Sequence, residues 1–368
     1  MNILILQKNT NKAGAQHALF RILSSAEFRK HDIVVICSTE GWLTHKLQEL
    51  DVTNIIKKYP SIKSITGKLF RIYNWTNKIS KKLKSIQFYP DIILSNNHIE
   101  FPYALKIQKK FNKSKTMIYF RDSYIKKHDF KKFQCEKANI KITVSQSMKD
   151  MLNYCNDLII IQDGLLEKEF YPTIAKKIFS PKQILLVGAP TFIKGWDIFF
   201  QVIKNIYRDN NIIISEKIVC TGIPNKEQFN KYNLTTHEIK KFNIVFSKKF
   251  ENLAYEARKY DLAIFPSRKE SFGLSQLEII AAGVPLLSSK TGIIEDVIKQ
   301  ADFLFEVDST KSLETKILNL YNNWKDINFN FEQSQNYIKL HNLIQIEIQK
   351  LLSLCLKEID EKNSLPSR

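Results

Sequence analysis

A short segment in the second half of the chain combines a strand end, a turn and a helix start. The run Leu262–Phe265 is apolar and of strand length, and Pro266 prevents its continuation because proline lacks the N–H that a strand needs. Apolar residues then recur at helical spacing from Leu274, and Gly283 stops the pattern. Ser271 is the predicted N-cap of this helix, since a serine oxygen can accept an N–H of the first turn.

Such a segment is suited to binding phosphate. The N–H groups of Phe272, Gly273 and Leu274 lack helical partners in the predicted geometry, and the helix dipole favours an anion beside them. Two carboxylates stand on either side, Glu270 in the loop and Glu278 about two turns inside the helix. Since carboxylates accept hydrogen bonds from hydroxyls, the segment predicts a site for phosphate groups with a sugar and a ribose beside them.

The rest of the chain must position this segment, and it alternates short β-branched runs with longer helical patterns. This alternation predicts parallel sheets that are covered by helices on both faces. The predicted strands of the first half are residues 2–6, 33–37, 91–95, 116–120 and 140–144. Those of the second half are residues 183–187, 217–220, 242–246, 262–265 and 284–287. Helices are predicted over residues 15–28, after the first strand, and 338–358, near the end.

Prolines near residue 170 mark the point where the first sheet ends and the second begins. Phe170–Pro172 and Ser180–Pro181 bracket a polar, lysine-containing stretch that is typical of an interdomain linker. We therefore expect an α/β protein of two Rossmann-like, doubly wound domains. The predicted domains are residues 1–168 and 169–340, followed by a C-terminal helix, residues 341–368, that can cross back to the first domain.

Composition excludes several classes of protein. The chain has 368 residues, 44% apolar and 25% charged, which suits a globular protein of two domains. Its five cysteines are scattered and lack C-x-x-C spacing, which argues against a disulfide framework or a zinc site and favours a reducing cytoplasm. The N-terminal pattern is not that of a signal peptide, and no apolar stretch approaches the ~18 residues of a spanning helix.

The net charge of +19 indicates a polyanionic partner, although a compositional bias toward lysine would also produce it. Residues 61–88 mix lysines and arginine with large apolar side chains, which predicts a basic amphipathic helix or a pair of them. Such a helix can lie on an anionic membrane surface, but a solvated helix face over the sheet gives the same pattern. Residues 124–133 form a second basic and aromatic patch.

The stretch 264–297 resembles the signature of a large family, the retaining glycosyltransferases of the GT-B fold that build bacterial surface polysaccharides. The shared features are Pro-Ser, two glutamates around a Gly-Leu turn, Ala-x-Gly-x-Pro, and a glycine followed by a glutamate, all in this order. The resemblance extends over roughly residues 1–300 and is dense in the second half only. It implies two Rossmann-like domains that face each other across a cleft.

The resemblance implies a donor-binding role for the predicted phosphate segment. Glu270 would contact the transferred sugar and Glu278 the ribose, while Ser271 and the amides of residues 272–274 would lie at the diphosphate. Lys194 matches the lysine that clamps the diphosphate and offsets the charge of the leaving group, so Lys194 and Glu270 are the predicted catalytic residues.

One donor residue of the family is missing. Gly188 opens the turn before the lysine, but the arginine that follows this glycine in the family is Ala189 here. Either Arg268 supplies the missing cation or the donor binds more weakly.

The first half contains four residues with a tentative acceptor or cleft role. Gly14 lies in a turn that resembles the Gly-Gly-Ala-Glu turn of the family, and His98 follows the predicted strand 91–95. His98 either faces the cleft or is a polar turn residue. Arg121 and Asp122 stand where many relatives have His-Asp, so a proton-handling histidine is absent from this position.

The resemblance implies a retaining hexosyltransferase that uses a nucleotide sugar, UDP- or GDP-linked, without a metal or other cofactor. The acceptor would be a lipid-linked or phosphorylated glycan of lipopolysaccharide, O-antigen or capsule synthesis. The enzyme would be cytoplasmic, and peripheral on the inner membrane if the basic helix binds lipid. The alternatives are a GT-B sugar-nucleotide epimerase and a non-catalytic relative, at which Ala189 and Arg121 hint. A nucleic-acid-binding protein is a remote alternative, because no fingerprint of one is visible, and we expect no nucleic-acid partner.

Overall fold

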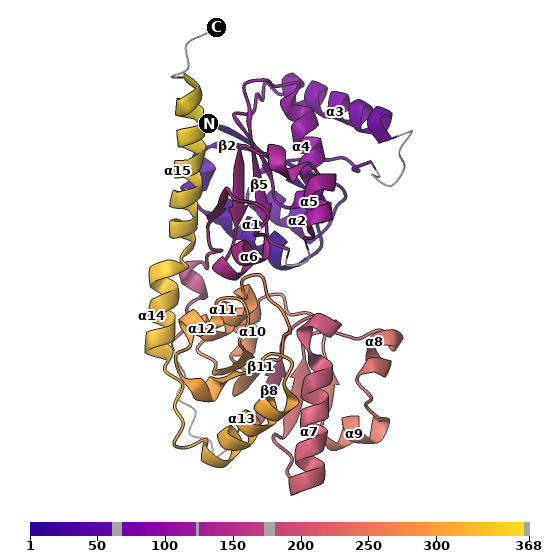
Figure 1. Cartoon of the computed structure of the whole chain (residues 1–368), viewed down its shortest axis with the longest axis vertical. Helices are drawn as coiled ribbons and strands as arrows, with labels where there is room; N and C mark the ends of the chain where they lie inside the picture. The colour runs from indigo at the N-terminus through magenta and orange to yellow at the C-terminus, as the bar shows by residue number, and fades with distance from the viewer. Residues whose placement is uncertain (61–67, 123–124, 173–180, 364–368) are drawn as a thin grey trace. The chain divides into compact units, whose positions relative to one another are not determined.

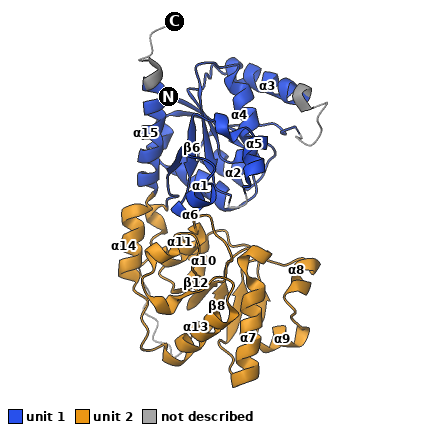
Figure 2. Ribbon diagram, in the orientation of Figure 1, with its two compact units in different colours: residues 1–164, 344–368 blue, residues 165–343 orange. Residues whose placement is uncertain are grey.

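The computed structural model describes residues 1–60, 68–122, 125–172 and 181–363. The chain divides into two compact α/β units, residues 1–164 with 344–368 and residues 165–343 (Figure 2). The predicted boundaries fall after residues 168 and 340, and the units divide after residues 164 and 343. In the described part of the chain, no helix combines the length and the apolar character that crossing a bilayer requires.

Unit 1 is built on a parallel sheet of seven strands in the order β3-β2-β1-β4-β5-β6-β7. Its central strands are almost wholly buried, as expected for β-branched runs covered by helices on both faces. The strands are β1 (Asn2–Gln7), β2 (Asp32–Cys37), β3 (Thr53–Ile56), β4 (Ile92–Ser95), β5 (Lys115–Phe120), β6 (Ile140–Thr143) and β7 (Leu158–Ile160).

The helices of unit 1 surround this sheet (Figure 1). They are α1 (Gly14–Ser24), α2 (Trp42–Glu49), α3 (Lys68–Ser85), α4 (Phe101–Gln108), α5 (Lys127–Lys132), α6 (Gln146–Met151) and α15 (Ile344–Asn363). Short 3-10 turns are η1 (Phe28–Lys30), η2 (His98–Glu100) and η3 (Cys135–Lys137). Helix α15 packs against α1, although the two are far apart in the sequence.

Unit 2 repeats the architecture with six parallel strands in the order β10-β9-β8-β11-β12-β13. The strands are β8 (Gln183–Leu186), β9 (Lys217–Cys220), β10 (Ile244–Phe246), β11 (Leu262–Phe265), β12 (Leu286–Ser289) and β13 (Leu304–Phe305). The helices are α7 (Trp196–Asn210), α8 (Lys226–Lys231), α9 (Thr236–Lys241), α10 (Leu253–Ala257), α11 (Leu274–Ala281), α12 (Ile294–Val297), α13 (Thr310–Asn323) and α14 (Phe331–His341). The 3-10 turns are η4 (Glu167–Glu169), η5 (Phe192–Lys194) and η6 (Ala301–Phe303).

The strand order reverses between β1 and β4 in unit 1 and between β8 and β11 in unit 2. In open parallel sheets, ligands bind outside the carboxyl ends of the strands at such a reversal. The turns that follow β8 and β11 contain the predicted donor residues. The turn that follows β4 contains His98, and helix α1, which follows β1, begins at Gly14.

The prediction of two parallel sheets is confirmed, but several elements differ from it. Three short strands, β3, β7 and β13, were not predicted. Strands β3 and β7 are partly exposed, and β13 has only two residues, so none of them shows a clear apolar pattern. The predicted helix over 15–28 ends at Ser24. The predicted helix over 338–358 is broken into α14 and α15, because Asn342 and Leu343 pair with the backbone of Leu165 instead of continuing the helix.

Three other expectations fall partly outside the described residues. Helix α3 occupies most of the predicted basic segment, whereas residues 61–67 are not described. The same holds for residues 173–180 of the predicted linker and for residue 124 of the second basic patch. All five cysteines are buried and free.

Candidate functional site

The start of helix α11 corrects one prediction. The N-cap is Gly273 and not Ser271, so the helix begins at Leu274. Gly273 has a φ of 99°, and a Cβ at this position would lie 1.9 Å from Oε1 of Gln276. A left-handed φ and a close neighbour both require glycine, which ends the loop and starts the helix here.

This later start changes the set of free backbone donors. The first N–H groups of the helix belong to Leu274, which is half-buried, and Ser275, which is exposed. Phe272, predicted as a donor at this point, is instead a buried loop residue whose carbonyl accepts the N–H of Ile293 at 3.0 Å. Glu278 is buried about one turn inside the helix, and not two.

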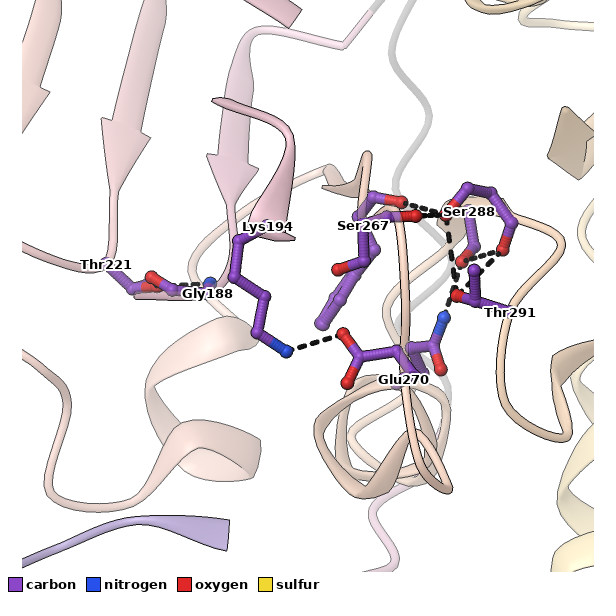
Figure 3. A network of polar contacts seen from close by, with 10 residues as sticks. Gly188, Lys194, Thr221, Ser267, Glu270, Ser288 and Thr291 are labelled. Carbon is purple, nitrogen blue, oxygen red and sulfur yellow. Dashed lines mark hydrogen bonds and ion pairs between the residues drawn. The ribbon is translucent and has the colours of Figure 1, made fainter. Parts of the chain in front are cut away.

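Lys194 and Glu270 come together although they are 76 residues apart in the sequence. Lys194 ends the 3-10 turn η5 after β8, and Glu270 lies in the loop between β11 and α11. Lys194 Nζ donates to Glu270 Oε1 at 2.5 Å (Figure 3), with side-chain exposures of 27% and 14%. Because β8 and β11 are neighbouring strands, their turns share one edge of the sheet, and this brings the predicted catalytic pair together.

Gly188 and Thr221 hold the turn under Lys194. Gly188 has a φ of 130°, and a Cβ there would lie 3.1 Å from Cβ and Cγ of Lys194. The lysine side chain can therefore pass over Gly188 only because glycine has no side chain. The N–H of Gly188 donates to Thr221 Oγ1 at 2.9 Å (Figure 3). Sequence analysis missed Thr221, whose only signal was its position directly after a predicted strand.

Arg268 forms ion pairs with two aspartates. Its guanidinium donates to both carboxylate oxygens of Asp197, at 2.8 and 2.7 Å, and to Asp308 at 2.7 Å. It also lies over the ring of Phe192, 3.8 Å from the centroid. Hydrogen bonds to Asp197 raise the pKa of Arg268 above its ordinary value. Two carboxylates already balance this cation, so the geometry does not favour Arg268 as a replacement for the arginine missing at Ala189.

A buried cluster of serines supports the loop before α11, and sequence analysis missed it. Ser289 Oγ donates to the carbonyl of Ser267 at 2.6 Å, and Gln276 Nε2 donates to Ser288 Oγ at 2.6 Å (Figure 3). Strand β12 thereby fixes both the loop and the first turn of α11. The available signal was a pair of serines in a strand that is otherwise apolar.

All four tentative acceptor residues lie near the carboxyl ends of the unit 1 strands. Gly14 is the first residue of α1, and a Cβ there would meet no atom within 4 Å. His98 is 6% exposed, its ring meets the edge of Phe133, and its Nδ1 finds no partner among the described residues. Burial lowers the pKa of His98, although the charge of Asp122 partly opposes this shift.

Arg121, the fourth of these residues, is the centre of a buried polar network. Its guanidinium donates to Asp163 at 2.9 Å, to Glu347 of α15 at 3.2 Å and to Asn96 at 3.0 Å. The second oxygen of Glu347 accepts the N–H of Gly164 at 2.8 Å. Burial raises the pKa of Glu347 to about 8 and also raises that of Asp163. Arg121 therefore links α15 and the end of the first chain segment to the sheet of unit 1.

Glu100 is a second buried acid that sequence analysis missed. One carboxylate oxygen accepts the N–H of Lys8 at 2.9 Å, and the other finds no partner among the described residues. Burial raises the pKa of Glu100 to about 7. No pattern in the sequence marks this residue, since a single glutamate before a helical run is ordinarily exposed.

The geometry of unit 2 suits a phosphorylated ligand. A lysine, a helix start with free N–H groups and two carboxylates gather at the carboxyl ends of β8 and β11. Within the described ranges, no group of three or more histidine, cysteine or acidic side chains is placed to hold a metal ion.

Comparisons of sequence agree with this geometry. Residues 168–339, slightly less than half of the chain, match the family model described as glycosyl transferases group 1. An uncharacterized glycosyltransferase of Methanocaldococcus jannaschii is 28% identical over 284 residues, which are 73% of this chain and 75% of the relative.

Solved structures extend the likeness over the whole chain. HepE of Anabaena in complex with UDP and glucose superposes with a TM-score of 0.76 at 13% identity, over 99% of this chain and all of that one. The lipopolysaccharide outer core galactosyltransferase WaaB superposes with a TM-score of 0.68 at 15% identity, over 97% of this chain and 99% of that one. The predicted GT-B fold, with two parallel-sheet α/β domains, is therefore confirmed.

Proposed function

We propose that this chain is a retaining hexosyltransferase that takes its sugar from a UDP- or GDP-linked donor bound to unit 2. The observation that carries the proposal is the Lys194–Glu270 pair beside the start of α11. The match of residues 168–339 to a glycosyltransferase family and the GT-B fold support it.

The charges of the site suggest how the donor binds. The diphosphate lies at the N–H groups of Leu274 and Ser275, where the helix dipole favours an anion. Lys194 leaves Glu270 and turns to the diphosphate, which frees the Glu270 carboxylate to accept a hydroxyl of the sugar. Glu278 accepts a hydroxyl of the ribose.

Transfer requires stabilisation of the departing nucleoside diphosphate. Negative charge grows on the phosphate oxygen as the glycosidic bond breaks, and a prearranged cation and helix start stabilise it more in the transition state than in the ground state. We propose that this electrostatic contribution takes the place of a metal ion. Retention rests on the family resemblance, with the acceptor attacking the face from which the diphosphate leaves.

A structurally similar protein supports the proposed type of donor nucleotide. HepE of Anabaena is solved with UDP, with UDP and glucose, and with UDP-glucose, which supports a uridine or similar nucleotide here. For the acceptor we propose a lipid-linked or phosphorylated glycan of a bacterial surface polysaccharide that binds unit 1. The likeness to WaaB, a lipopolysaccharide galactosyltransferase, supports this choice.

A thermal-shift panel of UDP, GDP, ADP and CMP with their sugars tests the proposal. We expect one nucleoside diphosphate to raise the Tm of the wild-type protein, and the rise to disappear in Lys194→Ala and Glu278→Ala. The Tm of the variants without ligand serves as the folding control. If no nucleotide raises the Tm of the wild type, the proposal is wrong.

We also propose that the enzyme is cytoplasmic and binds the inner face of the membrane through a basic surface on unit 1. Helix α3 contains no acidic residue and packs beside α4. Lysines of α3 and of the segment after α4 are exposed, and Nζ of Lys110 lies 4.9 Å from the centroid of the exposed ring of Tyr73. This basic surface comprises Lys78, Lys81, Lys82, Lys84, Lys109 and Lys110.

Flotation with lipid vesicles tests membrane binding. The wild-type protein is expected to float with vesicles that contain phosphatidylglycerol and not with phosphatidylcholine alone, because each lysine near an anionic surface contributes about 1 kcal/mol. Lys78→Glu with Lys81→Glu and Lys82→Glu should abolish flotation. A matched triple change on unit 2, at the exposed Lys226, Lys240 and Lys311, should preserve it. Equal flotation of both triple variants would contradict the assignment of this surface.

A further inference from the structure

A cavity of unit 2 is lined by none of the proposed donor residues. It lies between the turn after β8 and helix α8, and its volume is about 210 Å³. This is smaller than the ~300–1,000 Å³ of sites for drug-sized ligands, so it has room for a single ring. The residues on which the argument depends are Pro190, Phe192, Asp197, Glu227, Lys231 and Tyr232.

One residue on the wall of the cavity, Tyr232, has an unsatisfied polar group. Tyr232 is 5% exposed, and its hydroxyl has no hydrogen-bond partner in the described part of the chain. An unsatisfied buried donor is costly, so such groups point to a ligand or a water that completes them.

The outer wall of the cavity is apolar and open. Phe192 is 65% exposed, which is unusual for so large an apolar side chain, and Pro190 lies beside it in the same turn. The guanidinium of Arg268 covers one face of the ring at 3.8 Å and holds its orientation. A fixed, exposed aromatic ring can pack against the C–H face of a sugar ring.

The charges around the cavity cancel. Asp197 is paired with Arg268 at 2.7 Å, and Glu227 is paired with Lys231 at 2.9 Å. A phosphate or carboxylate would find no unbalanced cation among these four groups. The lining therefore suits a neutral ligand that has an apolar face and several hydroxyls.

We infer that this cavity is a second carbohydrate subsite, which holds a neutral, non-reacting pyranose ring of a glycan against Phe192, with a sugar hydroxyl bonded to Tyr232. The choice of a glycan rests on the proposed function, but the subsite does not share residues with the donor site. It would bind a glycan through a ring that takes no part in the transfer.

Saturation-transfer NMR on the full chain tests the subsite with methyl hexosides, neutral disaccharides and uridine. We expect the saccharides to bind wild type, with the ring protons of one sugar saturated most. Phe192→Ala should weaken binding by about two- to tenfold, as expected for the loss of one aromatic contact. Tyr232→Phe should weaken it without lowering Tm, because its hydroxyl has no hydrogen-bond partner among the described residues. Tyr255→Ala removes another exposed aromatic of unit 2 and should leave binding unchanged.

The UDP thermal shift, measured in parallel, separates this inference from the proposed function. Saccharide binding that falls in Phe192→Ala and Tyr232→Phe supports the subsite, whether or not UDP binds. A UDP shift without saccharide binding overturns the subsite alone. The subsite is also overturned if saccharide binding is indifferent to both variants, or if uridine, and not a sugar, is the ligand that Phe192→Ala releases.

Discussion

The ion pair between Lys194 and Glu270 is partly exposed, at 27% and 14%, so its contribution to folding stability is small. Exposed pairs typically contribute about 0–1 kcal/mol. Ligand binding explains better why these two opposite charges lie beside a free helix start. Lys194 can exchange Glu270 for the diphosphate of the donor, and Glu270 can exchange Lys194 for a hydroxyl of the sugar.

Lys194→Met therefore separates function from stability. We expect unfolding free energy to change by less than about 1 kcal/mol, and turnover of the donor to fall by about 10²-fold or more, as for loss of one transition-state donor. Lys290→Met is the matched control, since Lys290 pairs with Glu306 at 2.5 Å on the same unit. Urea unfolding and donor hydrolysis measure the two effects. Wild-type turnover in Lys194→Met would rule out its catalytic role.

Glu100 predicts a pH dependence of stability. Burial raises its pKa to about 7, so the folded protein binds this proton at pH values where the unfolded chain has released it. Stability from this group is fully present below about pH 4.5 and is lost as the pH rises to about 7. Glu100→Gln keeps an oxygen for the N–H of Lys8 and has no charge to bury.

We expect Glu100→Gln to be more stable than wild type at pH 8, by about 3 kcal/mol, and nearly equal to it at pH 4.5. Tm measured from pH 4.5 to 8 checks the difference. Glu49→Gln, at an exposed position, is the control and should show no such trend. A difference that is the same at both pH values would argue against a buried, titrating Glu100.

At the scale of elements, the start of α11 depends on one residue. Gly273 adopts a left-handed φ, and Gln276 fills the space where a Cβ would be. The serines of β12 then hold Gln276 and the preceding loop. The position of the helix start, and with it the proposed phosphate site, therefore depends on three elements together.

Gly273→Ala should destabilise unit 2 by about 1–3 kcal/mol, the usual cost of a strained backbone, and should weaken nucleotide binding because the helix start shifts. Gly14→Ala is the control: it is also at a helix start, but a Cβ there meets no atom within 4 Å. Urea unfolding and the UDP thermal shift provide both measurements. Equal stability of the two variants would show that the left-handed turn is not a constraint.

At the scale of the molecule, helix α15 joins the end of the chain to unit 1. Glu347 of this helix, Asp163 and Arg121 form one buried network of ion pairs. Arg121 also donates a hydrogen bond to the side chain of Asn96, which follows β4. The same Glu347 binds the N–H of Gly164, the last residue of the first segment of unit 1. The chain leaves unit 1 after Gly164 and returns to it at Ile344. The network therefore holds both of these chain segments against the sheet of unit 1.

Arg121→Met leaves two buried carboxylates without their cation. We expect a loss of about 3–5 kcal/mol, the typical cost of removing one partner of a buried ion pair. Arg208→Met, which removes an exposed arginine paired with Asp209, should cost less than about 1 kcal/mol. Urea unfolding of the full chain measures both. If Arg121→Met left the free energy of unfolding unchanged, the two carboxylates would have to bind protons or water at little cost.

Much of the fold could be predicted because the signals are local. Buried parallel strands are short apolar runs, and each predicted run overlaps an observed strand. The strands β3 and β13 lacked this signal because they are short and lie at the edges of their sheets. The break between α14 and α15 could not be predicted either, because it follows from pairing with Leu165, which is distant in the sequence.

The sequence by itself determined the alternation of strands and helices, the two-domain fold and the residue types of the donor segment, since these follow from local periodicity and turn chemistry. Only the tertiary structure decided which residues meet. The neighbouring strands β8 and β11 bring Lys194 to Glu270. Asp197 and Asp308 form ion pairs with Arg268. Gln276 fills the space beside Gly273, so that only glycine fits at the N-cap. The physical reason is that pairing and burial depend on strand order, which brings together groups that no local pattern connects.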